Sequence, residues 1–271
     1  MKKNEPYIAI VVAAGLSERM GSLKPLLDLG GRPTLYRLID SIIAAGIETI
    51  IVVTGHEHVT IENAMGMYKN EIGLHTSSCA LDGEKRVENT IYRLLTMNNE
   101  AYKTGMFSSV KTGIQKVSEL LQNADLSAHS HMATLLFLAD VPLVSADTIR
   151  GLIKEWENFG LSICFVDKIC VSEKDSENGS ASSQISVQAE PFAVPVYEGK
   201  NGHPLLIPKG HYDEILSYTG SGGLKAIRNN HKDSMVRYET KDKGCVLDMN
   251  TQDDYAALLD YLNEKKTPFN K

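Results

Sequence analysis

Residues 7–27, Y-I-A-I-V-V-A-A-G-L-S-E-R-M-G-S-L-K-P-L-L, constrain the fold of this chain more than any other stretch. The apolar run at 8–13 is too short for an independent helix and rich in β-branched residues, which predicts a buried strand of a parallel sheet. Gly15 ends the run and permits positive φ and close approach of the backbone to a ligand. Because Arg19 and Lys24 add two positive charges to the same turn, the segment predicts a loop that cradles a polyphosphate.

The spacing within this loop excludes two commoner phosphate-binding motifs. A Walker loop has the form G-x-x-x-x-G-K-[ST] and a dinucleotide fingerprint the form G-x-G-x-x-G, and neither occurs here. The pattern is A-A-G-x-S-x-R-M-G-x-x-K, beginning at Ala13 and ending at Lys24. The alternative interpretation is an ordinary Gly/Ser turn that follows a strand and carries solvated charges.

Length and composition favour one α/β domain over residues 1–271. A chain of 271 residues with 42% hydrophobic content can bury a full core, and helix-flanked sheets of this size commonly form one unit. Three weakly patterned or polar stretches, near 66–90, 123–131 and 170–190, are interpreted as insertions. The net charge of −6 argues against a general nucleic-acid binder, although residues 1–32 carry five Lys or Arg against three Asp or Glu.

The sequence shows no sign of membrane insertion or export. Its apolar runs fall short of the roughly 18 residues of a membrane span, and the polar start does not resemble a signal peptide. The four cysteines, Cys79, Cys164, Cys170 and Cys245, lack metal-type spacing and are expected to be reduced. These features predict a cytoplasmic protein without membrane contact.

The order of apolar patterns predicts a βαβ unit at the start of the chain. Apolar residues recur at helical spacing from Leu35 to Ile43, and a second strand at 50–53 ends in Thr54. Its strands should be parallel with a right-handed crossover. Further strands are predicted at 92–97, 133–139, 161–166 and 191–197. Since ligands bind at the carboxyl ends of such strands, Thr54 and Gly15 should share one crevice.

Two polar positions follow predicted elements at this edge. Asp140 comes directly after the strand at 133–139, where one carboxylate and phosphate oxygens could hold Mg²⁺, or where Asp could only cap the turn. Ser108 lies at the mouth of a helix, where free amides and hydroxyls suit a nucleotide, or where serine serves only as an N-cap.

The loop pattern resembles the signature of the nucleotidyltransferase family that includes the molybdenum cofactor cytidylyltransferases and guanylyltransferases. Four more segments resemble family motifs in the same order. They are G-M-F-S-S-V-K-T-G at 105–113, L-A-D-V-P at 138–142, G-H-P-L-L at 202–206 and D-M-N-T-Q-D-D at 248–254. The resemblance implies a Rossmann-like three-layer α/β/α nucleotidyltransferase fold with a mostly parallel sheet.

The resemblance also implies roles for individual residues. The implied nucleotide-binding residues are Ala13, Ala14, Gly15, Leu16, Ser17, Arg19, Thr54 and Ser108, and the implied catalytic residues are Lys24, Arg19 and Asp140. The implied acceptor-binding residues are Gly202, His203, Pro204 and Ser221, and the implied metal ligands are Asp140, Asn250 and Asp248. The implied cofactor is Mg²⁺, with Mn²⁺ as the alternative. Many relatives place acidic residues where Ser221 and Asn250 stand, which puts contacts through those carboxylates in doubt.

The implied reaction transfers CMP from CTP to the phosphate of molybdopterin and releases pyrophosphate. Ala14 matches the cytidylyl branch, whereas the guanylyl branch usually has a second glycine that makes room for a purine. The implied partners are CTP, a molybdopterin-type substrate and, transiently, the proteins that mature molybdoenzymes. Other interpretations stay open: GTP as donor, another acceptor such as a sugar phosphate or phosphocholine, and a nucleotide-binding module without catalysis.

Overall fold

The computed structural model describes residues 7–15, 23–73, 84–87, 90–122, 133–170 and 190–266. Its strands are β1 (Tyr7–Val12), β2 (Thr49–Thr54), β3 (Glu84–Val87), β4 (Thr90–Asn98), β5 (Ala133–Leu138), β6 (Ala193–Tyr197), β7 (Lys200–Asn201), β8 (Leu205–Pro208) and β9 (Val236–Glu239). Its helices are α1 (Thr34–Ala44), α2 (His58–Glu71), α3 (Met106–Gln122), α4 (Ala146–Cys170), α5 (Tyr212–Ser217), α6 (Gly223–Asn230) and α7 (Gln252–Lys266). Short 3₁₀ turns are η1 (Lys24–Leu26), η2 (Tyr102–Thr104), η3 (Lys209–His211), η4 (Lys232–Ser234) and η5 (Lys243–Val246).

The strands form one mixed sheet with a parallel centre. Its order is β3-β4-β2-β1-β5-β8-β6-β7, and β9 pairs with β6. The neighbours β4, β2, β1 and β5 are parallel, whereas β3 pairs antiparallel with β4 and β8 pairs antiparallel with β5. All six residues of β1 are buried, as expected of a strand covered on both faces. The predicted βαβ unit and the parallel sheet around it are confirmed.

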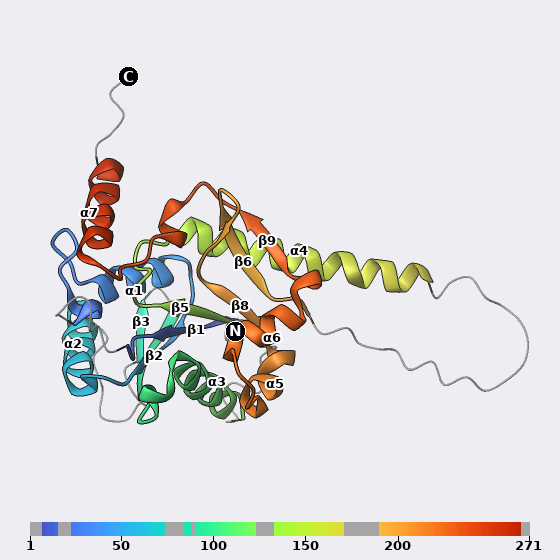
Figure 1. The fold of residues 1–271 in the computed structure, drawn as a ribbon, viewed down its shortest axis with the longest axis horizontal. Helices are drawn as coiled ribbons and strands as arrows, with labels where there is room; N and C mark the ends of the chain where they lie inside the picture. The colour runs from blue at the N-terminus through green and yellow to red at the C-terminus, as the bar shows by residue number, and fades with distance from the viewer. Residues whose placement is uncertain are drawn as a thin grey trace, which may run out of the picture.

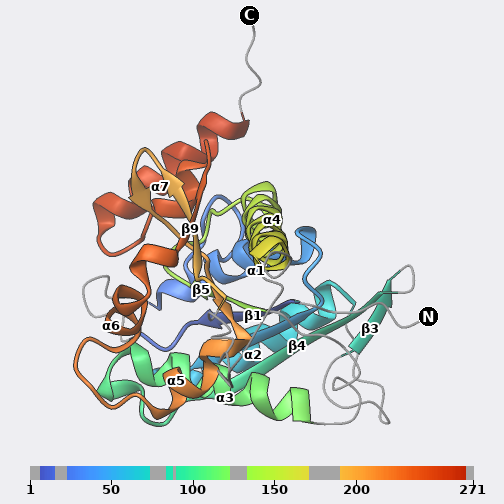
Figure 2. The same cartoon turned by 90° about the vertical axis from the view of Figure 1, so that its right-hand side faces the viewer.

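Helices cover both faces of the sheet (Figure 1). Ala9 and Val11 of β1 face a core shared with α1, α2 and α4, while Ile8 and Ile10 face a core shared with α3, α5 and α6. Alternate residues of one strand therefore serve two separate cores. Figure 2 shows α1 and α4 on one side of the sheet and α3 and α5 on the other. This arrangement confirms the predicted three-layer α/β/α fold.

A third, smaller group of buried apolar side chains lies under α7. We call it the satellite cluster: Leu29, Met249 and Leu258, with partly buried leucines and Tyr255 packed against it. The Tyr255 hydroxyl donates to the backbone oxygen of Asp28 at 2.5 Å. The satellite cluster joins the chain that follows Lys24 to the chain that precedes α7.

The predicted strand at 161–166 is wrong, because α4 continues through this segment to Cys170. A short apolar run fits a helix segment as well as a strand, and periodicity alone does not separate the two. The predicted insertions lie largely outside the described residues, which omit 74–83, 88–89, 123–132 and 171–189.

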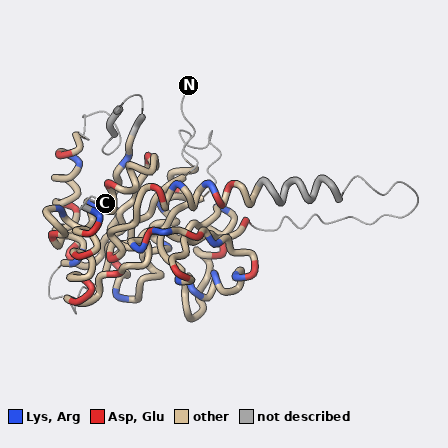
Figure 3. Tube along the Cα trace, turned by 90° about the horizontal axis from the view of Figure 1, so that it is seen from above, with Lys and Arg blue, Asp and Glu red and all other residues tan. Residues whose placement is uncertain are grey.

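Lys and Arg positions are interspersed with Asp and Glu positions along the described trace (Figure 3). None of the helices in the described part of the chain combines the length and apolar character that a membrane span requires.

Candidate functional site

The parallel strands β1, β2 and β5 end at the same level, and their carboxyl ends form the sheet edge on which the candidate site lies. The Ala13 N–H donates to the Val53 oxygen at 2.8 Å, and the Ala139 N–H donates to the Val12 oxygen at 3.0 Å. These bonds extend the pairing of β1 with β2 and β5 by one residue. The chain segments that follow, including Asp140, therefore leave the sheet side by side, as the rule for parallel sheets predicts.

A pocket of about 200 Å³ opens at this edge. The residues that line it are Val12, Ala13, Ala14, Gly15, Lys24, Pro25, Tyr102, Met106, Ser109, Leu138, Ala139 and Asp140. The structure thus brings together the described part of the predicted phosphate loop, the predicted catalytic lysine and the predicted metal ligand at the end of β5. Leu16, Ser17 and Arg19 lie outside the described residues, so their roles stay predictions.

Lys24 connects the phosphate loop to the segment before α7. Its Nζ donates to Asn250 Oδ1 at 3.0 Å, and Asn250 Nδ2 donates to Asp248 Oδ2 at 2.5 Å. The Lys24 carbonyl accepts a bond of 2.6 Å from the Thr34 hydroxyl, which fixes the 3₁₀ turn that carries the lysine. A positive side chain and two predicted metal ligands, distant in sequence, therefore meet at one place.

Asp140 is the most unusual group of the pocket. Its backbone oxygen accepts from the Met249 N–H at 2.8 Å, yet its side-chain Oδ1 is buried and has no hydrogen-bond partner among the described residues. Burial raises the pKa of Asp140; the positive charge of Lys24 opposes this rise and the negative charge of Asp248 adds to it. A buried carboxylate oxygen without a donor is poorly stabilised by the protein alone.

The oxygen atoms at this place suit a hard divalent cation. Mg²⁺ and Mn²⁺ are bound by carboxylate and amide oxygens, and Mg²⁺ commonly takes only one or two carboxylates besides phosphate oxygens. Asp140, Asp248 and Asn250 offer such oxygens, and the unpartnered Oδ1 of Asp140 is the atom that most needs a cation. The residues present therefore fit the implied metal.

Asn99, which sequence reasoning missed, organises the start of α3. Its buried side chain donates to Ser108 Oγ at 2.8 Å and to Ser109 Oγ at 2.9 Å, and accepts from the Ala101 N–H at 3.0 Å. The Ser108 hydroxyl also donates to the Gly105 oxygen at 2.8 Å. Ser108 is the third residue of α3 and its hydroxyl donates to a carbonyl, so it is not the N-cap of the alternative interpretation. Its neighbour Ser109 lines the pocket.

One wall of the pocket is closed by tight packing around Ala14. A Cβ atom built on Gly55 would lie 2.6 Å from the Tyr102 Cβ and 2.9 Å from the Ala14 Cβ, so only glycine fits between them. The aromatic ring of Tyr102 was not predicted for the site; a tyrosine in a loop gives no sequence signal of what it covers. Thr54 is buried below this wall, with its hydroxyl donating to the Met97 oxygen at 3.2 Å.

The predicted acceptor segment lies beside the end of η5. The His203 N–H donates to the Cys245 oxygen at 2.8 Å, and a Cβ on Gly202 would lie 2.5 Å from that same oxygen. Pro204 is buried next to them. Burial lowers the pKa of His203 to about 4, so its imidazole is neutral at pH 7. Ser221 is exposed, and the Tyr218 hydroxyl donates to its backbone oxygen at 2.8 Å.

Asp242 anchors the start of the segment that leads to Asp248. Its carboxylate accepts from the Ser145 N–H at 2.7 Å, the Thr148 hydroxyl at 2.9 Å and the Tyr261 hydroxyl at 2.8 Å. Burial alone would raise the pKa of Asp242, but the bonds from Ser145 and Tyr261 and the charge of Lys265 lower it to about 2. The ionised form is therefore the one that the fold stabilises.

We expect Asp242→Asn to lower the free energy of unfolding by about 2 kcal/mol at pH 7. Because the folded-state pKa is depressed, this stabilisation is complete above the unfolded-state pKa of about 4 and is lost as pH falls through about 2. Urea unfolding of wild type and variant at pH 7, 4 and 2.5 measures it. The exposed Asp260→Asn serves as control and should change little. A difference from wild type that stays constant down to pH 2.5 would contradict this linkage.

The sequence matches one family model over most of its length. Residues 9–235 match the model described as "MobA-like NTP transferase domain". Among curated proteins, "Bifunctional protein GlmU" from Bacillus cytotoxicus is 24% identical over 154 residues, which are 56% of this chain and 26% of that protein. The chain spans only about a quarter or less of the length of the curated relatives that it matches.

Solved structures share the fold. "A nucleotidyl transferase" from Methanothermobacter thermautotroptrophicus has a TM-score of 0.61 at 16% identity, covering 96% of this chain and 98% of that one. Rv0371c from Mycobacterium tuberculosis has a TM-score of 0.59 at 20% identity, covering 95% and 100%. Its complex with manganese has a TM-score of 0.53 at 18% identity, covering 94% and 98%. At these identities the similarity shows the fold alone.

Proposed function

The chain belongs to the MobA-like NTP transferase domain family, and from this membership we propose that it transfers CMP from CTP to the phosphate of a molybdopterin-type acceptor and releases pyrophosphate. The observation that carries the proposal is the meeting of Lys24, Asn250 and Asp248 near Asp140, whose Oδ1 has no hydrogen-bond partner among the described residues. A cation and a cluster of oxygen ligands at the carboxyl ends of parallel strands form the kind of site that holds a nucleoside triphosphate.

Nucleotidyl transfer asks the protein mainly to position groups and to neutralise charge. In our proposal, the backbone N–H groups of the loop from Ala14 to Ser17 and the Arg19 side chain hold the β and γ phosphates. Lys24 neutralises the α-phosphate and the incoming acceptor phosphate. No general base is required, because the acceptor phosphate is already an anion at neutral pH.

The proposed metal ligands are Asp140, with Asp248 and Asn250. A bound Mg²⁺ or Mn²⁺ would neutralise phosphate oxygens and orient the triphosphate. The chain itself holds these side chains in place through the Lys24 to Asn250 bond and the Met249 to Asp140 backbone bond. The manganese complex of Rv0371c supports a divalent ion in this fold.

The proposed acceptor-binding residues are Gly202, His203, Pro204 and Ser221. Burial is the main influence on the pKa of both Asp140 and His203, and the negative charge of Asp248 raises both pKa values, which supports an acceptor segment near the proposed metal ligands. A neutral imidazole at this place can offer a hydrogen bond without adding charge. We also propose that the protein is cytoplasmic and that it contacts, transiently, the proteins that mature molybdoenzymes.

Pyrophosphate release with each NTP, tested against molybdopterin, sugar phosphates and phosphocholine, tests the proposal. We expect CTP to be preferred, because the Ala14 methyl stands in the wall next to Tyr102 and narrows the space for a purine. Ala14→Gly should then raise the kcat/KM for GTP relative to CTP by about tenfold, the usual range for one methyl group in a pocket. The matched control, Ala44→Gly at the end of α1, should leave the ratio unchanged.

Other outcomes select other functions. A clear GTP preference in the wild type would refute the choice of CTP, and transfer only to a sugar phosphate or phosphocholine would refute the molybdopterin-type acceptor. CTP binding, seen as a thermal shift, without pyrophosphate from any acceptor would identify a nucleotide-binding module.

A further inference from the structure

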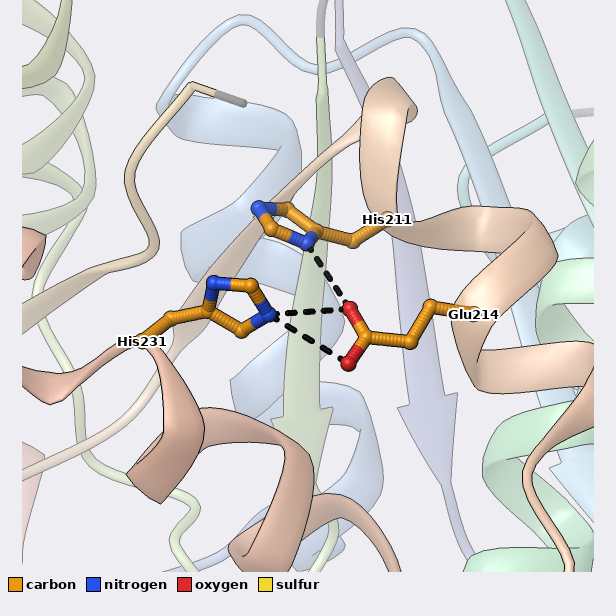
Figure 4. A group of neighbouring side chains, drawn as sticks. All are labelled: His211, Glu214 and His231. Carbon is orange, nitrogen blue, oxygen red and sulfur yellow. Dashed lines mark hydrogen bonds and ion pairs between the residues drawn. The ribbon is translucent and has the colours of Figure 1, made fainter. Parts of the chain in front are cut away.

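A second group of ligand-type side chains lies where α5 begins and α6 ends. It consists of His211, Glu214 and His231, and none of the three lines the described pocket. Figure 4 shows both imidazole rings turned toward the same carboxylate. His211 and Glu214 lie three residues apart, and His231 arrives from the far end of α6. Three side chains from two helices thus converge on one point.

The distances from Glu214 to the two imidazoles match those between the ligands of one metal ion. His211 Nδ1 lies 3.3 Å from Glu214 Oε2, and His231 Nε2 lies 3.0 Å from Glu214 Oε2 and 3.3 Å from Oε1. All three ligand atoms lie within 4.8 Å of one another. Tetrahedral Zn²⁺ with bonds of about 2.0–2.1 Å to nitrogen and oxygen separates its ligand atoms by roughly 3.3–3.4 Å.

The tautomer of His211 is set by its backbone partner, and it leaves Nδ1 available for a metal ion. Its Nε2 lies 2.8 Å from the backbone oxygen of Glu190, and since a carbonyl only accepts, Nε2 must carry the hydrogen. In the neutral ring, Nδ1 is then a bare lone pair that faces an oxygen of Glu214. Two acceptors in contact require a cation between them. Metal-bound histidines commonly donate their other N–H to a backbone carbonyl in this way.

The surroundings of His211 hold its ring in one orientation. The ring is only 2% exposed and stacks on Phe192, with centroids 4.2 Å apart and planes inclined by 26°. A metal ion would bind this ring in its neutral form, through Nδ1. Glu214 and His231 are more open, with side-chain exposures of 36% and 30%, which leaves solvent access for a fourth ligand.

We propose that His211 Nδ1, Glu214 and His231 Nε2 bind one Zn²⁺ ion, with water as the fourth ligand. Two imidazoles and a carboxylate suit zinc better than Mg²⁺ or Ca²⁺, which prefer oxygen ligands. The ion would tie the start of α5 to the end of α6. Ile215 and Ile227 of these helices lie in the core on the α3 face of the sheet, so the role is structural and separate from nucleotidyl transfer.

Calorimetric titration of the full, chelator-treated chain with ZnCl₂ tests this site. The buffer contains excess Mg²⁺, which is meant to occupy the oxygen ligands near Asp140 so that Zn²⁺ does not bind there. We expect one Zn²⁺ per chain and a higher Tm in its presence. His231→Gln keeps a hydrogen bond to Glu214 but removes the imidazole, and it should weaken Zn²⁺ binding by about 100-fold or more. Glu214→Gln should do the same, while the control His58→Gln should bind as the wild type does.

Both site variants change partly exposed side chains, and the Tm of each in chelator shows that it folds. The proposal is overturned if the wild type binds no Zn²⁺, because a proton then suffices between His211 and Glu214. It is also overturned if both site variants keep wild-type affinity, or if binding is lost in Asp140→Asn but retained in His231→Gln, which would place the ion in the pocket.

Discussion

Lys24→Ala is expected to lower kcat for pyrophosphate release by about 10²- to 10³-fold while the fold stays intact. Lys24 lies on a pocket wall, and its Nζ is within 3.0 Å of Asn250 Oδ1, so a triphosphate in the pocket would meet this charge directly. Removing one preorganised charge that stabilises the transition state typically has an effect of this size. The fold should tolerate the change because Lys24 is anchored through its backbone, by the bond from Thr34 to its carbonyl.

Steady-state kinetics with CTP, Mg²⁺ and the acceptor, together with the Tm of each protein, measure this effect. Lys154→Ala, an exposed lysine on α4, is the matched control and should retain wild-type turnover. If Lys24→Ala keeps full activity, the assignment of this lysine to charge neutralisation is wrong. A loss of activity accompanied by a large fall in Tm would instead show a structural role.

Asp140→Asn is expected to change activity and stability in opposite directions. Turnover should fall by about 10³-fold, because the carboxylate that would hold the divalent ion is gone. In metal-free buffer at pH 8, the free energy of unfolding should rise by about 1 kcal/mol or more, because the substitution removes the negative charge of a largely buried carboxylate whose Oδ1 has no hydrogen-bond partner among the described residues. Such a trade-off is typical of residues kept for chemistry at a cost in stability.

Thermal unfolding with and without Mg²⁺ or Mn²⁺ distinguishes the two effects. The Tm of the wild type should rise when the ion is added, and the Tm of Asp140→Asn should rise much less. Asp260→Asn, exposed on α7, should behave as the wild type in both respects. Retained turnover in Asp140→Asn, or an equal gain of Tm with the ion, would remove Asp140 from the metal site.

The elements nearest the pocket were predictable because their patterns are local. The run at 8–13 is apolar, β-branched and closed by glycine, and it forms β1. Asp140 follows a strand that pairs in parallel with β1, so topology alone brings it to the same edge as Gly15. The rule about strand ends therefore predicted the relative position of residues more than a hundred positions apart in the chain.

Features that depend on packing or on exact helical register were not predictable. Ser108 and Ser109 differ by about 100° around a helix axis, and only the register of α3 decides that Ser109 and not Ser108 lines the pocket. Tyr102 closes a wall because Gly55 leaves room for it. The group of His211, Glu214 and His231 combines two helices whose contact no local pattern shows.

The proposed metal ligands lie on parts of the chain that pack into hydrophobic cores of different size. β1 and the residue Ala139 that precedes Asp140 belong to the large cores of the sheet, whereas the segment with Asp248 and Asn250 packs through Met249 in the small satellite cluster. A region with so little buried apolar surface opens at a lower free energy than the whole molecule. Warming or mild denaturant should therefore release the segment with Asp248 and Asn250 while the sheet stays folded, and activity should be lost before the sheet unfolds.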